Sequence, residues 1–286
     1  MTLLRPLHLF FLALAYSLGA AIADYLGLAF SLSAFALGLA GICLAHASMN
    51  LLAEVFRPAN EPLVPGQPRA ERVYLRDRLL VVSIGLLAAA AALAYRLYHI
   101  QRLPLPAFAA LALSLLILFA YSVPPLGLAR RGFGELLLAA HIGYVAPLLG
   151  FVLQAGDFHR LVPILALPVT ALALAYFLVL DFPSFAEDLK YERLTLLTRL
   201  GWQRAIPLHH GLVLAAFLLL AAAPLFGISL RLIWPAFLTL PFAIFQIYLL
   251  RSLALGARPL WKPLAVAAAA LLALTIYLLA FSLYLR

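Results

Sequence analysis

Long apolar segments alternate with short polar segments along almost the whole chain. A helix needs roughly 20 apolar residues to cross a bilayer, and nine segments meet that length. They cover residues 7–28, 31–53, 77–98, 104–122, 135–155, 161–182, 205–226, 230–250 and 262–284. We therefore expect an all-α polytopic membrane protein, with nine transmembrane helices in a single domain over residues 1–286. Because the number of spans is odd, the two termini should lie on opposite sides of the membrane.

The composition supports a membrane protein and excludes several other classes. The 286 residues are 66% hydrophobic and only 11% charged, and a mean hydropathy of +1.07 exceeds what a soluble core of this size needs. The single cysteine, Cys43, excludes a disulfide framework and a cysteine-based metal site. No small-residue cleavage pattern follows the first apolar segment, which we therefore expect to be a retained helix.

The basic residues indicate an orientation. With the N-terminus in the cytoplasm, fifteen of the 20 Lys and Arg residues face the cytoplasm. The remaining five are Arg96, Arg102, Arg160, Arg231 and Arg286. This bias agrees with the positive-inside rule and predicts a cytoplasmic N-terminus and an external C-terminus, in the inner (plasma) membrane of a prokaryotic cell. The net charge of +9 then reflects contact with membrane lipids, and no basic block with interleaved aromatic residues indicates a nucleic acid partner.

Acidic residues gather in two loops, which follow the second and the sixth apolar segments. Six of the 11 carboxylates lie there: Glu54, Glu61, Asp181, Glu187, Asp188 and Glu192. In the orientation above both loops are cytoplasmic. Carboxylates that are concentrated in this way at the ends of membrane spans indicate metal or diphosphate chemistry. For either loop alone, solvated ion pairs with neighbouring arginines are the alternative.

The spacing within these loops places polar side chains on common helical faces. Asn50 and Glu54 are four residues apart. Asp181, Ser184 and Asp188 also share a face, provided that the helix kinks or restarts at the intervening proline. Oxygen ligands without cysteine or paired histidine favour Mg²⁺ over zinc. We expect Glu54, Asp181 and Asp188 to hold Mg²⁺, and these three residues with Asn50 to be catalytic.

Basic residues near the loops are candidates for binding a diphosphate. The arginine guanidinium is a planar fork that matches phosphate oxygens. The candidates form three sets: Arg69 with Arg72, Arg130 with Arg131, and Lys190 with Arg193. For Arg130 and Arg131, anchoring at the membrane surface is the alternative to ligand binding.

Four of the seven histidines have positions that indicate a role. His141 is one turn from Tyr144 in the fifth segment, and His46 lies one turn before the asparagine of the first acidic loop. Polar residues inside a membrane are often functional, but we expect both to be neutral and hydrogen-bonded between helices. His209 and His210 are expected to mark an interfacial helix start.

Two motifs resemble a known family. YSVPPLGLARRGFGELLLAAHIGYVAPLLG, from Tyr121 to Gly150, is similar to the YS-PP-basic-GE segment of the UbiA-type intramembrane prenyltransferases. The second acidic loop is similar to DxxDxxxDxxxGxxTLxxxxG, the pattern of the branch with digeranylgeranylglyceryl phosphate synthase and chlorophyll synthase. Its residues here are Asp181, Ser184, Asp188, Glu192, Thr195, Leu196 and Gly201. The resemblance covers nearly the whole chain.

The acidic loops also depart from the family pattern. Ser184 replaces the middle Asp of the second loop, and Glu192 replaces its Gly. The family's first loop reads NDxxDxxxD and then RPxxxG. That pattern is represented here by Asn50, Leu51, Glu54 and Pro58, followed by Glu61, Pro62 and Gly66.

The resemblance implies a nine-helix bundle whose two cytosolic loops hold Mg²⁺ and a prenyl diphosphate. The implied reaction transfers a polyprenyl group to a lipophilic acceptor: a quinone precursor, glycerol ether, carotenoid or tetrapyrrole. Tyr121 and Ser184 join the basic residues as expected substrate contacts. Because the loops have lost carboxylates, an inactive family member that serves as a lipid-binding or partner-binding scaffold is the alternative. A small-solute transporter is disfavoured, since no intramembrane charge line or pair of broken helices is visible.

Overall fold

The computed structural model describes residues 4–57, 61, 63, 68–101 and 103–285, and of residues 69, 70 and 101 it describes only the backbone. The described chain is helical. Its α-helices are α1 (Pro6–Tyr25), α2 (Leu32–Val55), α3 (Arg69–Gln101), α4 (Leu105–Ser122), α5 (Gly134–Ala140), α6 (Ala146–Ala155), α7 (Leu161–Asp181), α8 (Phe185–Lys190), α9 (Leu196–Leu200), α10 (Trp202–Ala222), α11 (Leu230–Ile233), α12 (Leu240–Ala254) and α13 (Trp261–Tyr284). Short 3₁₀ or π turns join some of them: η1 (Leu128–Arg130), η2 (His141–Val145), η3 (Phe182–Ser184), η4 (Ala223–Phe226) and η5 (Trp234–Thr239).

Nine stretches of the described chain are helical, long and apolar enough to cross a membrane. Each corresponds to one expected apolar segment, which confirms the predicted fold class. The third and the sixth are the most extended, and the third runs over Glu71–Ile100 where the apolar pattern covers 77–98. Its first turns are charged and continue the helix beyond the apolar stretch. His209 and His210 lie well inside α10, and His209 is fully buried, so they do not mark a helix start as expected.

The sixth span is interrupted where the sequence indicated. Helix α7 ends at Asp181, the 3₁₀ turn η3 contains Pro183, and α8 then carries Asp188. Proline removes a backbone donor and clashes with the preceding turn, so the regular helix cannot continue through it. The result is a short change of direction that separates the two aspartates.

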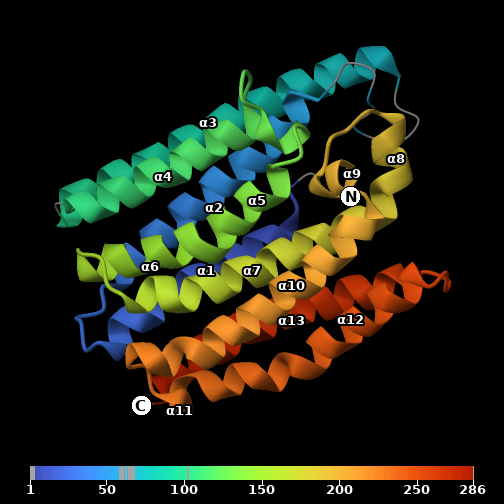
Figure 1. Cartoon of the computed structure of the whole chain (residues 1–286). Helices are drawn as coiled ribbons and strands as arrows, with labels where there is room; N and C mark the ends of the chain where they lie inside the picture. Colours follow the sequence, from blue (N-terminus) through green and yellow to red (C-terminus); the bar gives the residue numbers. More distant parts are fainter. Residues whose placement is uncertain (1–3, 58–60, 62, 64–67, 102, 286) are drawn as a thin grey trace.

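Helices α1, α6 and α7 form the centre of the bundle (Figure 1). The span made of α5, η2 and α6 buries 78% of its most apolar window, whereas the span of α3 buries 17% and faces outward. Gly19 and Gly150 let α1 and α6 meet closely. A Cβ at Gly19 would lie 1.9 Å from the Pro147 carbonyl oxygen, and one at Gly150 would lie 2.0 Å from the Tyr16 carbonyl oxygen. Small residues allow this backbone approach in lipid.

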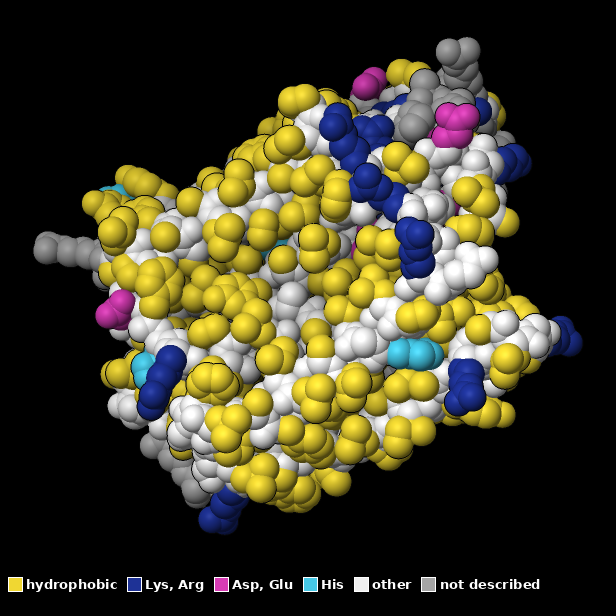
Figure 2. All heavy atoms as spheres, in the orientation of Figure 1, with side chains coloured by type: hydrophobic (Ala, Val, Ile, Leu, Met, Phe, Trp, Pro, Cys, Tyr) yellow, Lys and Arg dark blue, Asp and Glu magenta, His cyan; other side chains and the backbone are white. Residues whose placement is uncertain are grey.

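The surface matches a protein embedded in a bilayer. Hydrophobic side chains cover most of the face shown in Figure 2, and most of the visible Lys and Arg lie toward the end that carries α8 and α9. The first and last helices start and finish at opposite ends of the bundle (Figure 1). The protein is therefore an integral membrane protein.

Candidate functional site

Carboxylates from four elements meet at the end of the bundle that carries α8. Glu54 ends α2, Glu135 begins α5, Asp181 ends α7 and Asp188 lies in α8. Glu54 and Asp188 are almost fully buried, at 3% and 2% exposure, and Asp181 interacts electrostatically with both Glu135 and Asp188. The fold thus brings the two acidic loops together, although they are about 130 residues apart in the sequence.

Arginines neutralise most of this acid. Glu54 pairs with Arg5 at 3.2 Å through Oε1 and with Arg57 at 2.5 Å through Oε2. Arg57 also reaches Glu61, at 3.2 Å, and Arg193 pairs with the same carboxylate. These pairs connect the start of α1, the end of α2 and the loop after α8. The acids do form ion pairs with arginines, but these are not fully solvated pairs, because Glu54 and Glu61 are buried.

Asp188 is held by two neighbours in its own loop. The Arg193 Nη1 atom lies 3.1 Å from Asp188 Oδ1, and Ser184 Oγ donates a hydrogen bond of 2.8 Å to Asp188 Oδ2. Ser184, which replaces a family carboxylate, therefore orients the next one. Burial and the neighbouring Arg57 lower the pKa of Arg193 to about 10, so its guanidinium stays protonated at neutral pH.

Asp181 is arranged differently from the other carboxylates. It lies within hydrogen-bonding reach of Glu135, and neither residue has an ion-pair partner among the residues that the structure describes. The Oε2 atom of Glu135 accepts a 3.2 Å hydrogen bond from the backbone N–H of Leu196. Two ionised carboxylates in contact repel each other, and a cation between them relieves that repulsion. This pair is thus the part of the site that pairs with no arginine or lysine among the described residues.

The Asp181 and Glu135 carboxylates are the part of the site that fits Mg²⁺. In the described part of the chain, no group of three or more His, Cys, Asp or Glu side chains is arranged to hold a metal ion. Of the three expected ligands, Glu54 and Asp188 contact arginines instead. Mg²⁺ is commonly held by only one or two carboxylates together with substrate phosphates. Asp181 and Glu135 offer such a pair of oxygen donors, so the residues fit this ion.

Tyr121 and Asn50 complete the inner wall of the site. Tyr121 is buried, and its hydroxyl accepts a 3.2 Å hydrogen bond from Arg5 Nη1. Burial disfavours the charge of Arg5, but Tyr121 and Glu54 outweigh it and raise the pKa of Arg5. Asn50 is fully buried, and within the described part of the chain neither its side-chain oxygen nor its nitrogen has a hydrogen-bond partner. Buried amides without partners are rare in native proteins, so the Asn50 amide is available to form hydrogen bonds with a ligand.

Arg130 and Arg131 lie at the edge of this end of the bundle. They line a pocket of about 200 Å³ together with Pro124, Pro125, Leu126 and Gly127. Arg131 is exposed, and its Nη2 atom donates a 2.7 Å hydrogen bond to the Pro125 carbonyl. Arg130 is near enough to Arg76 for the two charges to repel. Both arginines therefore line a hollow at the surface, and neither forms an ion pair with a carboxylate among the residues that the structure describes.

The other predicted basic residues differ in position. Arg72 lies in the first turn of α3, near Arg76. Lys190 is exposed, and its Nζ atom lies 5.3 Å from the centre of the Tyr191 ring. The side chain of Arg69 lies outside the described residues. Arg193 is thus the predicted basic residue that directly contacts the acidic cluster.

Sequence reasoning missed three residues of the site: Arg5, Arg57 and Glu135. Arg5 and Arg57 were expected only as cytoplasmic basic residues, and Glu135 only as part of the YS-PP-basic-GE segment. A signal was present for Arg5 and Glu135: Arg5 directly precedes the proline that starts the first span, and Glu135 is the only acid within the fifth. Both positions lie at the ends of spans on the same membrane side as the acidic loops.

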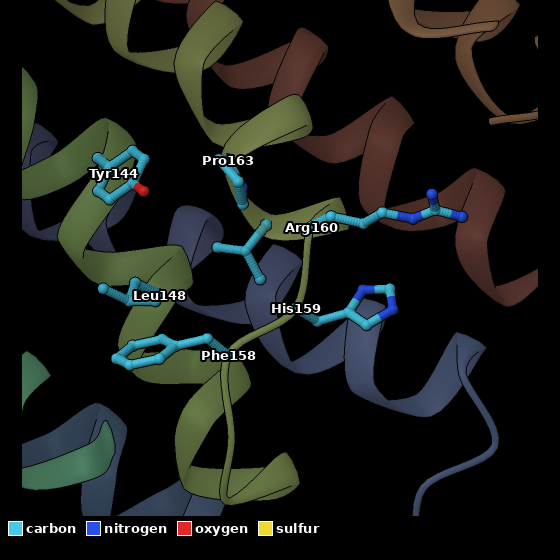
Figure 3. A pocket seen from close by; sticks show the side chains of 7 residues that line it. Tyr144, Leu148, Phe158, His159, Arg160 and Pro163 are labelled. Atoms are coloured by element: carbon cyan, nitrogen blue, oxygen red, sulfur yellow. The ribbon is translucent and has the colours of Figure 1, made fainter. Parts of the chain in front are cut away.

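A larger pocket lies at the opposite end of the bundle. Its volume is about 310 Å³, and it is lined by Tyr144, Leu148, Phe158, His159, Arg160, Val162 and Pro163. These residues are near the start of α7, about 30 Å from its end at a rise of 1.5 Å per residue. In Figure 3 the Arg160 and His159 side chains extend away from Tyr144 and Phe158. This pocket is separate from the acidic cluster.

Comparison with known proteins identifies the family. The UbiA prenyltransferase family matches residues 9–262. The chain belongs to the UbiA prenyltransferase family. It is therefore a UbiA-family membrane prenyltransferase, as the motifs predicted. No curated protein matches the sequence significantly.

Solved structures of UbiA homologues share the fold. A homologue from Archaeoglobus fulgidus bound to DMAPP and Mg²⁺ is 17% identical, with a TM-score of 0.67 and 97% of each chain covered. The same homologue bound to GPP and Mg²⁺ is also 17% identical and gives a TM-score of 0.68, covering 97% of this chain and 98% of that one. A homologue from Aeropyrum pernix K1 without ligand is 18% identical, with a TM-score of 0.61 and 96% of each chain covered. At these identities the match concerns the fold.

The positions that depart from the UbiA pattern have visible consequences. Leu51, where the family has an acid, is 3% exposed and packs in the interior. Glu192, where the family has glycine, adopts a φ of 52°, a conformation that favours glycine. Pro58 lies outside the described residues. In the first loop of this UbiA member, a position that is acidic in the family thus holds an apolar side chain that packs in the interior.

Proposed function

We propose that the protein transfers a polyprenyl group from a prenyl diphosphate to a lipophilic acceptor in a Mg²⁺-dependent reaction at the cytoplasmic face of a prokaryotic inner membrane. The acceptor would be a quinone precursor, glycerol ether, carotenoid or tetrapyrrole. The observation that carries the proposal is the Asp181–Glu135 pair, which forms no ion pair with any residue that the structure describes, beside a cluster of arginine-paired carboxylates. The bound DMAPP, GPP and Mg²⁺ of the Archaeoglobus homologue support it.

Arginines that pair with carboxylates would receive the diphosphate. Arg5, Arg57 and Arg193 are partly accessible, with 20–32% of each side chain exposed, whereas the carboxylates they contact are buried. Their free N–H groups can therefore bind phosphate oxygens while the buried carboxylates hold the other side of each guanidinium. Arg72, Arg130, Arg131 and Lys190 would add positive charge at the entrance, and Arg69 is proposed on sequence alone.

Asp181 and Glu135 would hold the metal ion, with Asn50, Glu54 and Asp188 around it. When bound, Mg²⁺ supplies positive charge that stabilises the diphosphate as a leaving group. Tyr121 fixes Arg5 through its hydroxyl, and Ser184 fixes Asp188. These contacts preorganise donors and charges around the leaving group, which is the main source of catalysis in such sites.

The aromatic residues next to Asp181 suit the reacting carbon. Phe182 contacts Trp202 at 5.2 Å between ring centres, and Trp202 lies 6.1 Å from Trp261. Aromatic faces attract cations, and apolar rings exclude water. The C1–O bond of the donor breaks and diphosphate leaves with the electron pair. The acceptor then bonds to C1 and loses a proton.

Substitution of the two aspartates tests this assignment. Purified protein with geranylgeranyl diphosphate, Mg²⁺ and a panel of acceptors should release pyrophosphate or form alkylated product. Asp181→Asn and Asp188→Asn should each lower turnover by about 100-fold, since each removes a charge that positions the diphosphate. Glu187→Gln is the matched control, because Glu187 is exposed in the same loop.

Two results would contradict the proposal. Unchanged turnover in both aspartate variants would remove the metal-site assignment. If wild-type protein shows no Mg²⁺-dependent binding of prenyl diphosphates of any chain length, the scaffold alternative is favoured instead.

A further inference from the structure

Three histidines from different helices lie buried inside the bundle, within a few helical turns of the acidic cluster. His8 of α1, His46 of α2 and His141 of η2 are exposed by 6%, 0% and 1%. The Nδ1 atoms of His46 and His141 are 3.0 Å apart, and His141 Nε2 lies 2.8 Å from Ser114 Oγ. The expectation of histidines hydrogen-bonded between helices is met for His46 and His141. The proposed function leaves this network unused.

The network leaves one nitrogen of His46 without a partner. A neutral imidazole carries one N–H and one lone pair. If His46 donates from Nδ1 to His141, its Nε2 atom holds a bare lone pair, while His141 donates to Ser114. That Nε2 atom is buried and has no hydrogen-bond partner among the residues that the structure describes. An unsatisfied buried polar atom costs about 1–3 kcal/mol. A ligand that forms a hydrogen bond with this nitrogen would remove that cost.

Other unpartnered atoms lie along the same helix interface. The Nδ1 atom of His8 is buried without a hydrogen-bond partner in the described part of the chain, and the ring centre of His8 is 6.1 Å from that of His46. Asn50, whose side-chain amide is also unpartnered, is one turn from His46 on α2. Arg5, which pairs with Glu54, is one turn before His8. The free polar atoms therefore extend from the acidic cluster into the bundle between α1 and α2.

The backbone around His141 is also unusual. His141–Val145 forms a turn of π-helix between α5 and α6. Such turns occur mostly as single insertions in α-helices, and frequently at functional sites. The ring of His141 stacks on that of His46, with centres 5.2 Å apart and planes at 12°. This contact fixes the orientation of His46.

We propose that His8 and His46 bind the hydroxylated head group of the acceptor, and that His46 Nε2 accepts the proton that the acceptor loses. The proposal rests on the prenyl transfer proposed above. A new bond forms between the acceptor and C1 of the prenyl group, the C1–O bond to diphosphate breaks, and the acceptor proton moves to His46. The positive charge of the protonated imidazole is shared with His141 through their hydrogen bond. His141 and Ser114 are positioning residues.

Substitution of His46 tests the role directly. His46→Gln keeps a polar side chain of similar length but cannot take up a proton. With geranylgeranyl diphosphate as donor, and 4-hydroxybenzoate and a glycerol monoether as hydroxylated probes, we expect kcat to fall about 100-fold, within the range for a lost general base. The KM for geranylgeranyl diphosphate should change less than twofold. His209→Gln is the matched control, since His209 is equally buried and pairs with Gln246 in another part of the bundle.

Substitutions of Ser114 distinguish a positioning role from simple packing. Ser114→Ala should lower kcat several-fold, and Ser114→Thr, which retains the hydroxyl, should restore it. Equal loss in both variants would indicate packing and contradict the assigned role. Thermal unfolding of each variant in detergent should stay close to that of wild type.

A non-cleavable analogue, geranylgeranyl thiolodiphosphate, distinguishes failure of this inference from failure of the proposed function. If wild type does not bind the analogue, the proposed function fails and the inference with it. If wild type binds it but accepts neither hydroxylated probe, or if His46→Gln turns over like wild type, only the acceptor assignment is overturned. Binding of the analogue by His46→Gln together with lost turnover supports it.

Discussion

Glu192 occupies a backbone conformation that costs free energy for any residue with a Cβ. Its φ is 52°, and its side chain is exposed in the loop after α8. The left-handed conformation costs a non-glycine residue roughly 1–2 kcal/mol, and the greater freedom of unfolded glycine offsets part of that gain. Glu192→Gly should therefore raise the free energy of unfolding by about 0.5 kcal/mol, measured by chemical unfolding in detergent.

A neighbouring glutamate provides the contrast for that measurement. Glu187 is also exposed, but it lies within helix α8. Glu187→Gly should lower the free energy of unfolding by about 0.5–1 kcal/mol, because glycine is a poor helix former. A shift of the same sign in both variants would show that the loop conformation is not the cause.

At the residue scale, the sequence predicted the acids of the site better than their partners. Glu54 and Asp188 were recognisable because they follow long apolar segments at helical spacing. The contacts of Glu54 with Arg5 and of Glu61 with Arg193 depend on the tertiary fold, since these pairs are 49 and 132 residues apart. No local pattern indicates these two pairs, whereas Arg57 with Glu54 and Arg193 with Asp188 are close in the sequence.

At the element scale, the contact between α1 and α6 depends on two glycines. A Cβ at Gly150 would lie 2.0 Å from the Tyr16 carbonyl oxygen and 3.2 Å from the Ala20 nitrogen. Because these are backbone atoms, the helices themselves must separate. Gly150→Ala should lower the free energy of unfolding by about 1–3 kcal/mol, the usual cost of overpacking, and should lower the Tm in detergent.

The control for this prediction is Gly211 in α10, where an added Cβ meets no atom within 4 Å. Gly211→Ala should leave the Tm unchanged or raise it slightly, because alanine favours helix over glycine. Equal Tm values for Gly150→Ala and wild type would contradict the close approach of α1 and α6.

The sequence predicted the helices but not all of their irregularities. Apolar length alone located the nine spans, and Pro183 indicated the break after α7. The π turn at His141 carries no comparable local signal, because it depends on packing and on hydrogen bonds to α2 and α4. The extension of α3 was missed since charged residues continue the helix beyond the apolar stretch.

At the scale of the whole molecule, the proposed orientation can be tested by chemical labelling. In a Cys43→Ala background, Asp157→Cys places a thiol in the exposed turn after α6, and Glu187→Cys places one near the acidic cluster. A membrane-impermeant maleimide should label the first in intact cells and the second only after permeabilisation. The reverse pattern would invert the proposed topology and place the site outside.

The fold of the whole molecule is far less sensitive to sequence than the site is. Homologues with 17% or 18% identity share it over nearly their full length, because apolar length and small contact residues suffice to specify the bundle. Family membership was therefore predictable from a few motifs. The acceptor was not, since the residues proposed to contact it, His8 and His46, lie on separate helices and leave no contiguous motif.

The contact of Arg5 with Tyr121 and Glu54 also affects how the protein is best handled. A purification tag fused directly before Arg5 would place extra chain beside the acidic cluster. Helix α13 begins near that cluster at Trp261, which packs against Phe182, and runs about 36 Å toward the other end of the bundle. An affinity tag and its linker therefore belong after α13.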